Sequence, residues 1–253
     1  MDLPVQFDER VRPDIVKRAV LSIQSKNRQD YGADPESGLK HVTRLNQRNN
    51  AFRTQKGRGM SRAPKKAMMS RGSQFHWVGA EAPHTRGGRT AHPPKAEKDF
   101  KEEINDRERR KAIRSAIAAT TDEELVSEKH RYDGELPLVS DSIESVEKTQ
   151  ELEKHLEDLG LEEELERSGE KSVRGGRGTS RGRKYRRRTG PLVVVSEVGG
   201  IVDAASNLAG VEVSLVENLN AELLAPGAEP GRLTVWSESA VEKLEQEDLF
   251  VDR

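Results

Sequence analysis

The fold is decided by the stretch from Leu192 to Leu244, which reads LVVVSEVGGIVDAASNLAGVEVSLVENLNAELLAPGAEPGRLTVWSESAVEKL. Three short apolar runs stand out in it, at Leu192–Val195, Val211–Val216 and Leu233–Trp236. Short runs rich in β-branched residues and bounded by turn residues are typical of buried strands. The stretch therefore predicts three strands.

Helical segments separate these runs. We expect a short helix over Val202–Leu208, closed by Gly210, and a helical turn over Asn220–Leu224. Ser239 with Glu242 has the spacing of a capping box and predicts the start of a last helix that runs through Leu244. Strands that alternate with helices predict an α/β fold, with a mostly parallel sheet and helices on both of its faces.

Further elements precede this stretch. The apolar spacing predicts a helix over Arg12–Asp30, with Pro13 in its first turn, and a short buried strand over Leu136–Val139. Two more helices carry cap signals. One begins at Asn105, with Glu108 as the capping-box partner. Ile113, Ala116 and Ile117 form its apolar face, and its basic face includes Arg114. The other runs from Ser142 to Leu159 and is closed by Gly160.

Charge is separated into blocks along the chain. Lys40–Lys95 holds 13 Lys and Arg against the single acid Glu81, and Lys171–Arg188 holds nine against none. Thr120–Glu170 reverses this, with 18 acids against five Lys and Arg. The formal net charge of −1 hides this asymmetry, which indicates a polyanionic partner.

Lys40–Lys95 has no apolar period, so we expect a long basic loop without regular structure. Fully extended at ~3.3 Å per residue, it could reach roughly 90 Å out and back. Phe75, His76 and Trp77 lie near its middle, where a tip could stack on unpaired bases. A flexible, solvated tail or linker is the alternative. The cationic candidates for RNA binding are Arg53, Lys56, Arg58, Arg62, Lys65, Lys66, Arg71, Arg86, Arg89 and Lys95.

The second basic block lies in a stretch, Leu161–Gly190, that also shows no pattern. Its positive charges repel one another unless a polyanion neutralises them, and counterion release then favours binding. A nuclear-localisation-like or non-specific patch is the alternative. Its candidate RNA-binding residues are Arg174, Arg177, Arg181, Arg183, Lys184, Tyr185, Arg186, Arg187 and Arg188.

Other functions find little support. The chain has no cysteine, which excludes disulfides and thiol catalysis, and no apolar run approaches the length of a membrane span. The start Met1-Asp2-Leu3-Pro4 does not resemble a secretory signal. Gly199-Gly200 lacks the spacing of a phosphate loop and is interpreted as a tight turn. We expect no metal at His76, His84 and His92, and no cofactor, small-molecule substrate or catalysis. We interpret the acidic run of Glu162, Glu163, Glu164 and Glu166 as a solvated helix face or as partners of basic neighbours.

Several motifs together resemble a known family. They are Lys56-Gly57-Arg58-Gly59, Arg89-Thr90-Ala91-His92-Pro93-Pro94-Lys95, Asn105-Asp106-Arg107-Glu108-Arg109, Gly182-Arg183-Lys184-Tyr185-Arg186-Arg187, Asn207-Leu208-Ala209-Gly210 and Leu224-Ala225-Pro226-Gly227. On these residues, and over nearly its whole length, the chain resembles the archaeal and eukaryal type of the L-four family of large-subunit ribosomal proteins. It lacks the short strand pair that usually precedes Asp2 in that family.

The resemblance implies a structural protein of the cytoplasmic large ribosomal subunit. A single α/β domain would comprise residues 1–39 and 96–253, with an rRNA-contacting segment at 171–190. Residues 40–95 would form an extended loop that reaches into 23S-type rRNA. Its tip, near Arg71–His84, would line the peptide exit tunnel beside the L-twenty-two protein and meet the nascent peptide. The alternatives are a free-standing RNA chaperone or regulator with an α/β core and, more distantly, a nucleotide-binding enzyme.

Overall fold

The computed structural model describes residues 3–43, 46–72 and 74–251. Ser73 and the first two residues of Met1-Asp2-Leu3-Pro4 lie outside the described residues. The chain divides into two compact units. Residues 1–27 and 101–253 form one, called here the α/β unit, and residues 28–100 form the other, called here the hairpin unit. Each is described by itself.

A four-stranded sheet organises the α/β unit. Its strands are β3 (Leu138–Ser140), β6 (Leu192–Val195), β7 (Glu212–Leu215) and β8 (Thr234–Ser237), in the order β3-β8-β6-β7. Every pair of neighbours is parallel. The four predicted strands are therefore confirmed to within two residues. β6 and β8 are buried along their whole length, because a parallel sheet is covered on both faces.

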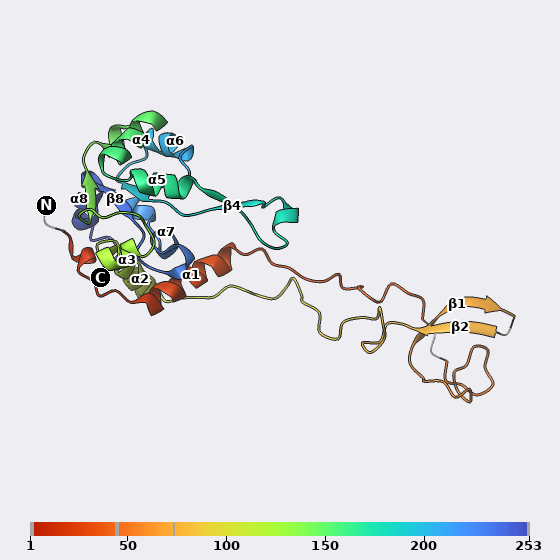
Figure 1. The fold of residues 1–253 in the computed structure, drawn as a ribbon. Helices are drawn as coiled ribbons and strands as arrows, with labels where there is room; N and C mark the ends of the chain where they lie inside the picture. Colours follow the sequence, from red (N-terminus) through yellow and green to blue (C-terminus); the bar gives the residue numbers. More distant parts are fainter. Residues whose placement is uncertain (1–2, 44–45, 73, 252–253) are drawn as a thin grey trace. The chain divides into compact units, whose positions relative to one another are not determined.

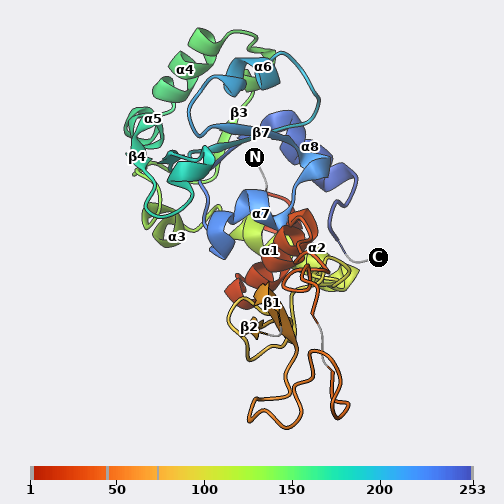
Figure 2. The same ribbon diagram turned by 90° about the vertical axis from the view of Figure 1, so that its right-hand side faces the viewer.

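Helices cover both faces of the sheet, as Figure 2 shows. On one face α1 (Pro13–Asn27), α2 (Asp106–Ala118), α7 (Ala221–Leu224) and α8 (Glu238–Gln246) pack on Leu192, Val194 and Trp236. On the other face α4 (Thr149–Asp158), α6 (Ile201–Ser206) and α3 (Glu123–Ser127) pack on Val193, Val195 and Val235. Alternate residues of each strand thus serve alternate cores. The α/β prediction is confirmed.

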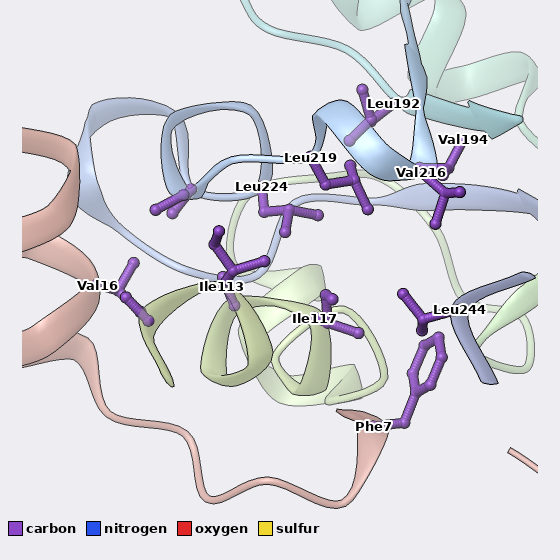
Figure 3. Packing of buried hydrophobic residues seen from close by; sticks show 14 of the residues in the cluster. Phe7, Val16, Ile113, Ile117, Leu192, Val194, Val216, Leu219, Leu224 and Leu244 are labelled. Carbon is purple, nitrogen blue, oxygen red and sulfur yellow. The ribbon is translucent and has the colours of Figure 1, made fainter. Parts of the chain in front are cut away.

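Figure 3 shows the first of these cores. Val16 of α1 and Ile113 and Ile117 of α2 face Leu192 and Leu224. Phe7 packs edge-on against Trp236, with 5.2 Å between the ring centroids. The apolar side of the second predicted helix, Ile113, Ala116 and Ile117, is therefore confirmed as core.

Of three predicted N-caps, two are wrong and one is right in position only. Asn105 precedes α2, but its side chain makes no capping hydrogen bond. Ser142 caps nothing, because a short 3-10 turn, η2 (Ile143–Ser145), separates it from α4. The last helix begins two residues early, with the Ser237 hydroxyl accepting from the backbone N–H of Ala240. Gly160, at φ +81°, does follow α4 as predicted.

The prediction that Leu161–Gly190 lacks regular structure is wrong for most of its two ends. The stretch contains α5 (Glu162–Gly169) and an antiparallel pair, β4 (Lys171–Val173) with β5 (Tyr185–Arg187). The remaining short turns of this unit are η1 (Val5–Phe7), η3 (Thr179–Arg181), η4 (Val216–Asn218) and η5 (Pro226–Ala228). Among the described residues no helix is long and apolar enough to span a bilayer.

The hairpin unit consists of two legs and a β-hairpin (Figure 1). β1 (Lys65–Arg71) pairs antiparallel with β2 (Gln74–Gly79), so the prediction of Lys40–Lys95 without regular structure is wrong for this part. Hydrogen bonds join the two legs along their length. Ala33 N–H donates to Pro94 O (2.9 Å), and Thr43 Oγ1 donates to Glu81 Oε2 (2.5 Å). At the hairpin, Ala80 N–H donates to Pro64 O (3.0 Å).

Candidate nucleic-acid interface

The β4–β5 hairpin carries the most concentrated positive charge of the α/β unit. Lys171 pairs with Arg187, Ser172 with Arg186 and Val173 with Tyr185. Between the strands, Arg174 N–H donates to Lys184 O (2.8 Å) and closes the loop. Short antiparallel pairing therefore orders a segment in which the sequence showed no period. The predicted cations that it presents to solvent are Arg174, Arg177, Arg181, Arg183, Lys184, Arg186, Arg187 and Arg188.

Tyr185 is the aromatic residue of this hairpin. The residue is 47% exposed, and its ring centroid lies 5.0 Å from Lys171 Nζ and 5.2 Å from Lys184 Nζ. A half-exposed ring beside two ammonium groups can stack on a base while the lysines meet the adjacent phosphates. The structure thus brings Tyr185 and the predicted cations of this segment together on one hairpin.

The root of this hairpin is held by buried charge. Glu164 is fully buried, and its carboxylate accepts from Arg167 Nη2 (2.6 Å), His130 Nδ1 (2.6 Å) and the Arg131 backbone N–H (3.0 Å). The same Arg167 Nη2 donates to Thr189 O (2.7 Å), just beyond β5. Burial alone would raise the pKa of Glu164, but these hydrogen bonds outweigh it and lower the pKa to about 2.

This network decides between the two interpretations of the acidic run. Glu162, Glu163 and Glu166 are exposed and form a solvated helix face, whereas Glu164 is buried and balances basic neighbours. Sequence reasoning missed Arg167 and His130 altogether. The signal present was the three-residue spacing of Glu164 and Arg167 on one helix face. Nothing in the sequence pointed to His130.

In the hairpin unit, the predicted cations fall into two groups. Arg53, Lys65 and Lys66 are partly buried and bind within the protein; Arg53, for example, lies 4.7 Å from the Phe75 ring centre and Lys65 Nζ lies 3.3 Å from Gln55 Oε1. These three therefore stiffen the unit. The cations that face solvent are Lys56, Arg58, Arg62, Arg71, Arg86, Arg89 and Lys95.

The three aromatic candidates do not act as one group. Phe75 and Trp77 share a face of β2, where Phe75 also meets Phe52 edge-on at 5.5 Å. His76 points to the opposite face and is exposed, because side chains alternate along a strand. Phe52, which sequence reasoning left out, is 70% exposed. The exposed aromatic surface here is therefore Phe52 with the half-buried Phe75 and Trp77.

The carboxyl end of the sheet is closed by a carboxylate. Open parallel sheets bind nucleotides at this end, where the strand order reverses, which here is between β6 and β8. Glu144 fills that position: it accepts from Ser196 N–H (2.6 Å), Ser237 Oγ (2.6 Å) and Ser239 Oγ (2.8 Å). Burial opposes its charge, yet these bonds lower the pKa of Glu144. A phosphate would meet a fixed negative charge.

No group of three or more His, Asp or Glu in residues 3–43, 46–72 and 74–251 is placed to hold a metal ion.

The exposed basic hairpins and the closed sheet end define a class: an α/β protein whose charged surface can bind a polyanion. Residues 1–247 match the sequence profile of the family described as "Ribosomal protein L4/L1 family". The chain belongs to this family, so it is a ribosomal protein and not an enzyme, and the resemblance stated above is confirmed.

Archaeal relatives align along nearly the whole chain, and each is named "Large ribosomal subunit protein uL4". The Nanoarchaeum equitans protein is 46% identical over 252 residues, covering 99% of this chain and 94% of the relative. The Halobacterium salinarum protein is 50% identical over 251 residues, covering 97% and 94%. The Archaeoglobus fulgidus protein is 44% identical over 247 residues, covering 96% and 92%.

Proposed function

We propose that this chain is a structural constituent of the large subunit of the cytoplasmic ribosome, where it binds 23S-type rRNA and supports assembly. The β4–β5 hairpin carries the proposal. Lys171–Arg188 holds nine Lys and Arg and no acid, and its described cations face solvent. Family membership and the names of the relatives agree with this role.

Binding would follow from counterion release. Each phosphate that a Lys or Arg neutralises adds about 0.7 to 0.9 to the log–log salt slope of the association constant. The hairpin contributes several such contacts from a small, pre-paired element, because its root is fixed by Arg167 and by Arg232, whose Nε donates to Gly190 O (3.1 Å). Less entropy is then lost when RNA orders the distal loop.

Residues 40–95 would be the loop that reaches into the rRNA. In this proposal the segment Arg71–His84 lines the peptide exit tunnel beside the L-twenty-two protein and meets the nascent peptide. Two features support a wall-forming role: the hairpin exposes apolar side chains, Met68 (65%), Met69 (61%) and Val78 (49%), and its legs present cations. Apolar groups can line a passage, while cations along the legs meet phosphates.

A free-standing RNA chaperone or regulator is the second candidate, because the same exposed hairpin would bind RNA away from the ribosome. Fractionating cell lysate on sucrose gradients at moderate and at high salt separates the two. We expect about one copy per large subunit, retained through the salt wash. Protein at the top of the gradient, or protein that washes off readily, would support the chaperone and contradict an integral ribosomal role.

A further inference from the structure

The hairpin unit contains a hollow in which Lys95 is the only one of the candidate RNA-binding residues named above. It has a volume of about 620 Å³, within the range of roughly 300–1,000 Å³ typical of pockets for small ligands. Its main lining residues are Tyr31, Pro93, Pro94, Lys95, Lys98 and Phe100. The two legs of the unit meet here, so the hollow combines residues far apart in the sequence.

One wall is a stack of two aromatic rings. Tyr31 and Phe100 lie 5.3 Å apart between ring centroids and 15° from parallel. The Arg28 guanidinium lies 4.8 Å from the Phe100 centroid and 5.2 Å from that of Tyr31. The Tyr31 residue remains 51% exposed. A stacked pair that leaves this much aromatic surface open is a platform for another planar group.

The other lining residues supply prolines and positive charge. Lys95 and Lys98 line the hollow, and Lys98 Nζ lies 5.2 Å from the Phe100 centroid. Glu97 and Asp99 alternate with these lysines in the sequence, but no acidic residue lines the hollow. Its charge therefore favours an anion.

The walls are fixed to each other. Ala33 N–H donates to Pro94 O (2.9 Å), and the backbone at Gly32 comes so close to Ala96 that a Cβ would not fit. A rigid frame lowers the entropy lost when a ligand binds. Planar aromatic surface and two ammonium groups on this rigid frame match one nucleotide: a base on the rings and a phosphate on the lysines.

We propose that this hollow binds one unpaired nucleotide of the rRNA, with its base stacked on the Tyr31–Phe100 wall and its phosphate held by Lys95 and Lys98. The inference rests on the proposed function and adds a contact to it. An acidic segment of a neighbouring protein is the competing occupant, but such a segment would leave the aromatic wall without a planar partner.

The test measures binding of the full chain to a transcript of its large-subunit rRNA across a range of KCl concentrations. Replacing both Tyr31→Ala and Phe100→Ala should weaken binding roughly tenfold to a hundredfold without changing the salt slope, because stacking is not ionic. Tyr31→Trp should retain binding and Tyr31→Leu should not. Lys95→Gln with Lys98→Gln should flatten the slope by about 0.7, because the contact with one phosphate is lost. Val198→Ala, an exposed apolar residue of the α/β unit, is the control.

Ultraviolet cross-linking of the wild-type complex gives an independent measurement. A nucleotide attached to a peptide that contains Tyr31 or Phe100 is the expected product. The inference is overturned if the double aromatic variant binds the transcript with an affinity within twofold of wild type, or if the Tyr31→Leu variant binds it as tightly as the Tyr31→Trp variant. A wild-type chain that fails to bind the transcript would instead overturn the proposed function, and this site with it.

Discussion

Replacing Glu164 by glutamine should destabilise the α/β unit, because it leaves the Arg167 guanidinium buried without its counter-charge. The two Glu164 oxygens accept from Arg167 Nε (2.7 Å) and Nη2 (2.6 Å), His130 Nδ1 (2.6 Å) and Arg131 N–H (3.0 Å). A glutamine offers one acceptor oxygen and turns an N–H₂ group toward these donors. At least two hydrogen bonds are lost, and one donor pair clashes.

The size of the effect follows from the pKa of Glu164. Its ordinary value is 4.5, and in the folded protein it falls to about 2. At about 1.36 kcal/mol per pKa unit, this corresponds to about 3 kcal/mol of folded-state stabilisation. Breaking a buried ion pair from one side costs a similar amount, roughly 3–5 kcal/mol. The free energy of unfolding at pH 7 should therefore fall by about 3 kcal/mol in Glu164→Gln.

The pH dependence has a definite sign. Because the folded-state pKa is lowered, the stabilisation from the Glu164 carboxylate is complete above pH 4.5 and is lost as the pH falls toward about 2. The gap between wild type and Glu164→Gln should therefore narrow across this window. Urea unfolding at pH 7, 5, 3 and 2 measures it, followed by fluorescence of the buried Trp236 in a Trp77→Phe background.

Glu163→Gln is the matched control, since Glu163 lies on the same helix and is exposed. Its free energy of unfolding should change by less than about 0.5 kcal/mol. A loss below about 1 kcal/mol for Glu164→Gln at pH 7 would refute the buried-pair reasoning. A gap that stays constant between pH 5 and pH 2 would show that the carboxylate charge is not the cause.

Three further predictions test other parts of the chain. Changing Arg183, Arg186 and Arg187 together to Ala should weaken rRNA binding and flatten its salt slope by about 2 to 3, and an unchanged slope would contradict their contact with phosphates. Replacing residues 65–79 by an Asn-Gly turn is sterically simple, because Ala80 N–H already bonds Pro64 O. Gradient fractionation should then show incorporation into subunits largely intact, with cross-links from nascent peptide to this protein lost; failure to incorporate would show that the hairpin anchors the protein. Gly231→Ala should cost more than about 1 kcal/mol in urea unfolding, since Gly231 has φ +101° and a Cβ would lie 2.7 Å from Leu125 O, and an unchanged midpoint would refute this.

The sheet could be predicted because its strands are buried on both faces. The run Leu192–Val195 has no polar residue, as expected for a strand that is buried on both faces, and its β-branched residues favour a strand. The start of the last helix was predicted wrongly, at Ser239 instead of Ser237. Ser239 instead donates to Glu144, which leaves the cap to Ser237. That choice depends on a residue far away in the sequence.

The functional surface, too, could be predicted from the sequence only in part. Composition identified both basic segments, because a like-charged block is visible without structure. Phe75 and Trp77 lie on one face of β2 and His76 on the other, which could be predicted only if Gln74–Gly79 was known to be a strand. The β1–β2 hairpin contains no apolar run that would indicate this strand. The Tyr31–Phe100 stack joins residues from the two ends of a long loop. Its discovery needed the pairing of the legs, which no local pattern encodes.

The charge blocks gain their physical meaning from the root of the β4–β5 hairpin. Nine cations within residues 171–188 repel one another, and only three residue pairs join the two strands. Such an element would not keep one position without an anchor. The buried Arg167 and Arg232 supply this anchor. The buried Glu164 and the half-exposed Glu212 compensate their charge, and other N–H groups of the two arginines donate to Thr189 O and Gly190 O. Two carboxylates of the chain thus help to position a basic surface, whose own charge is left for an external polyanion to neutralise.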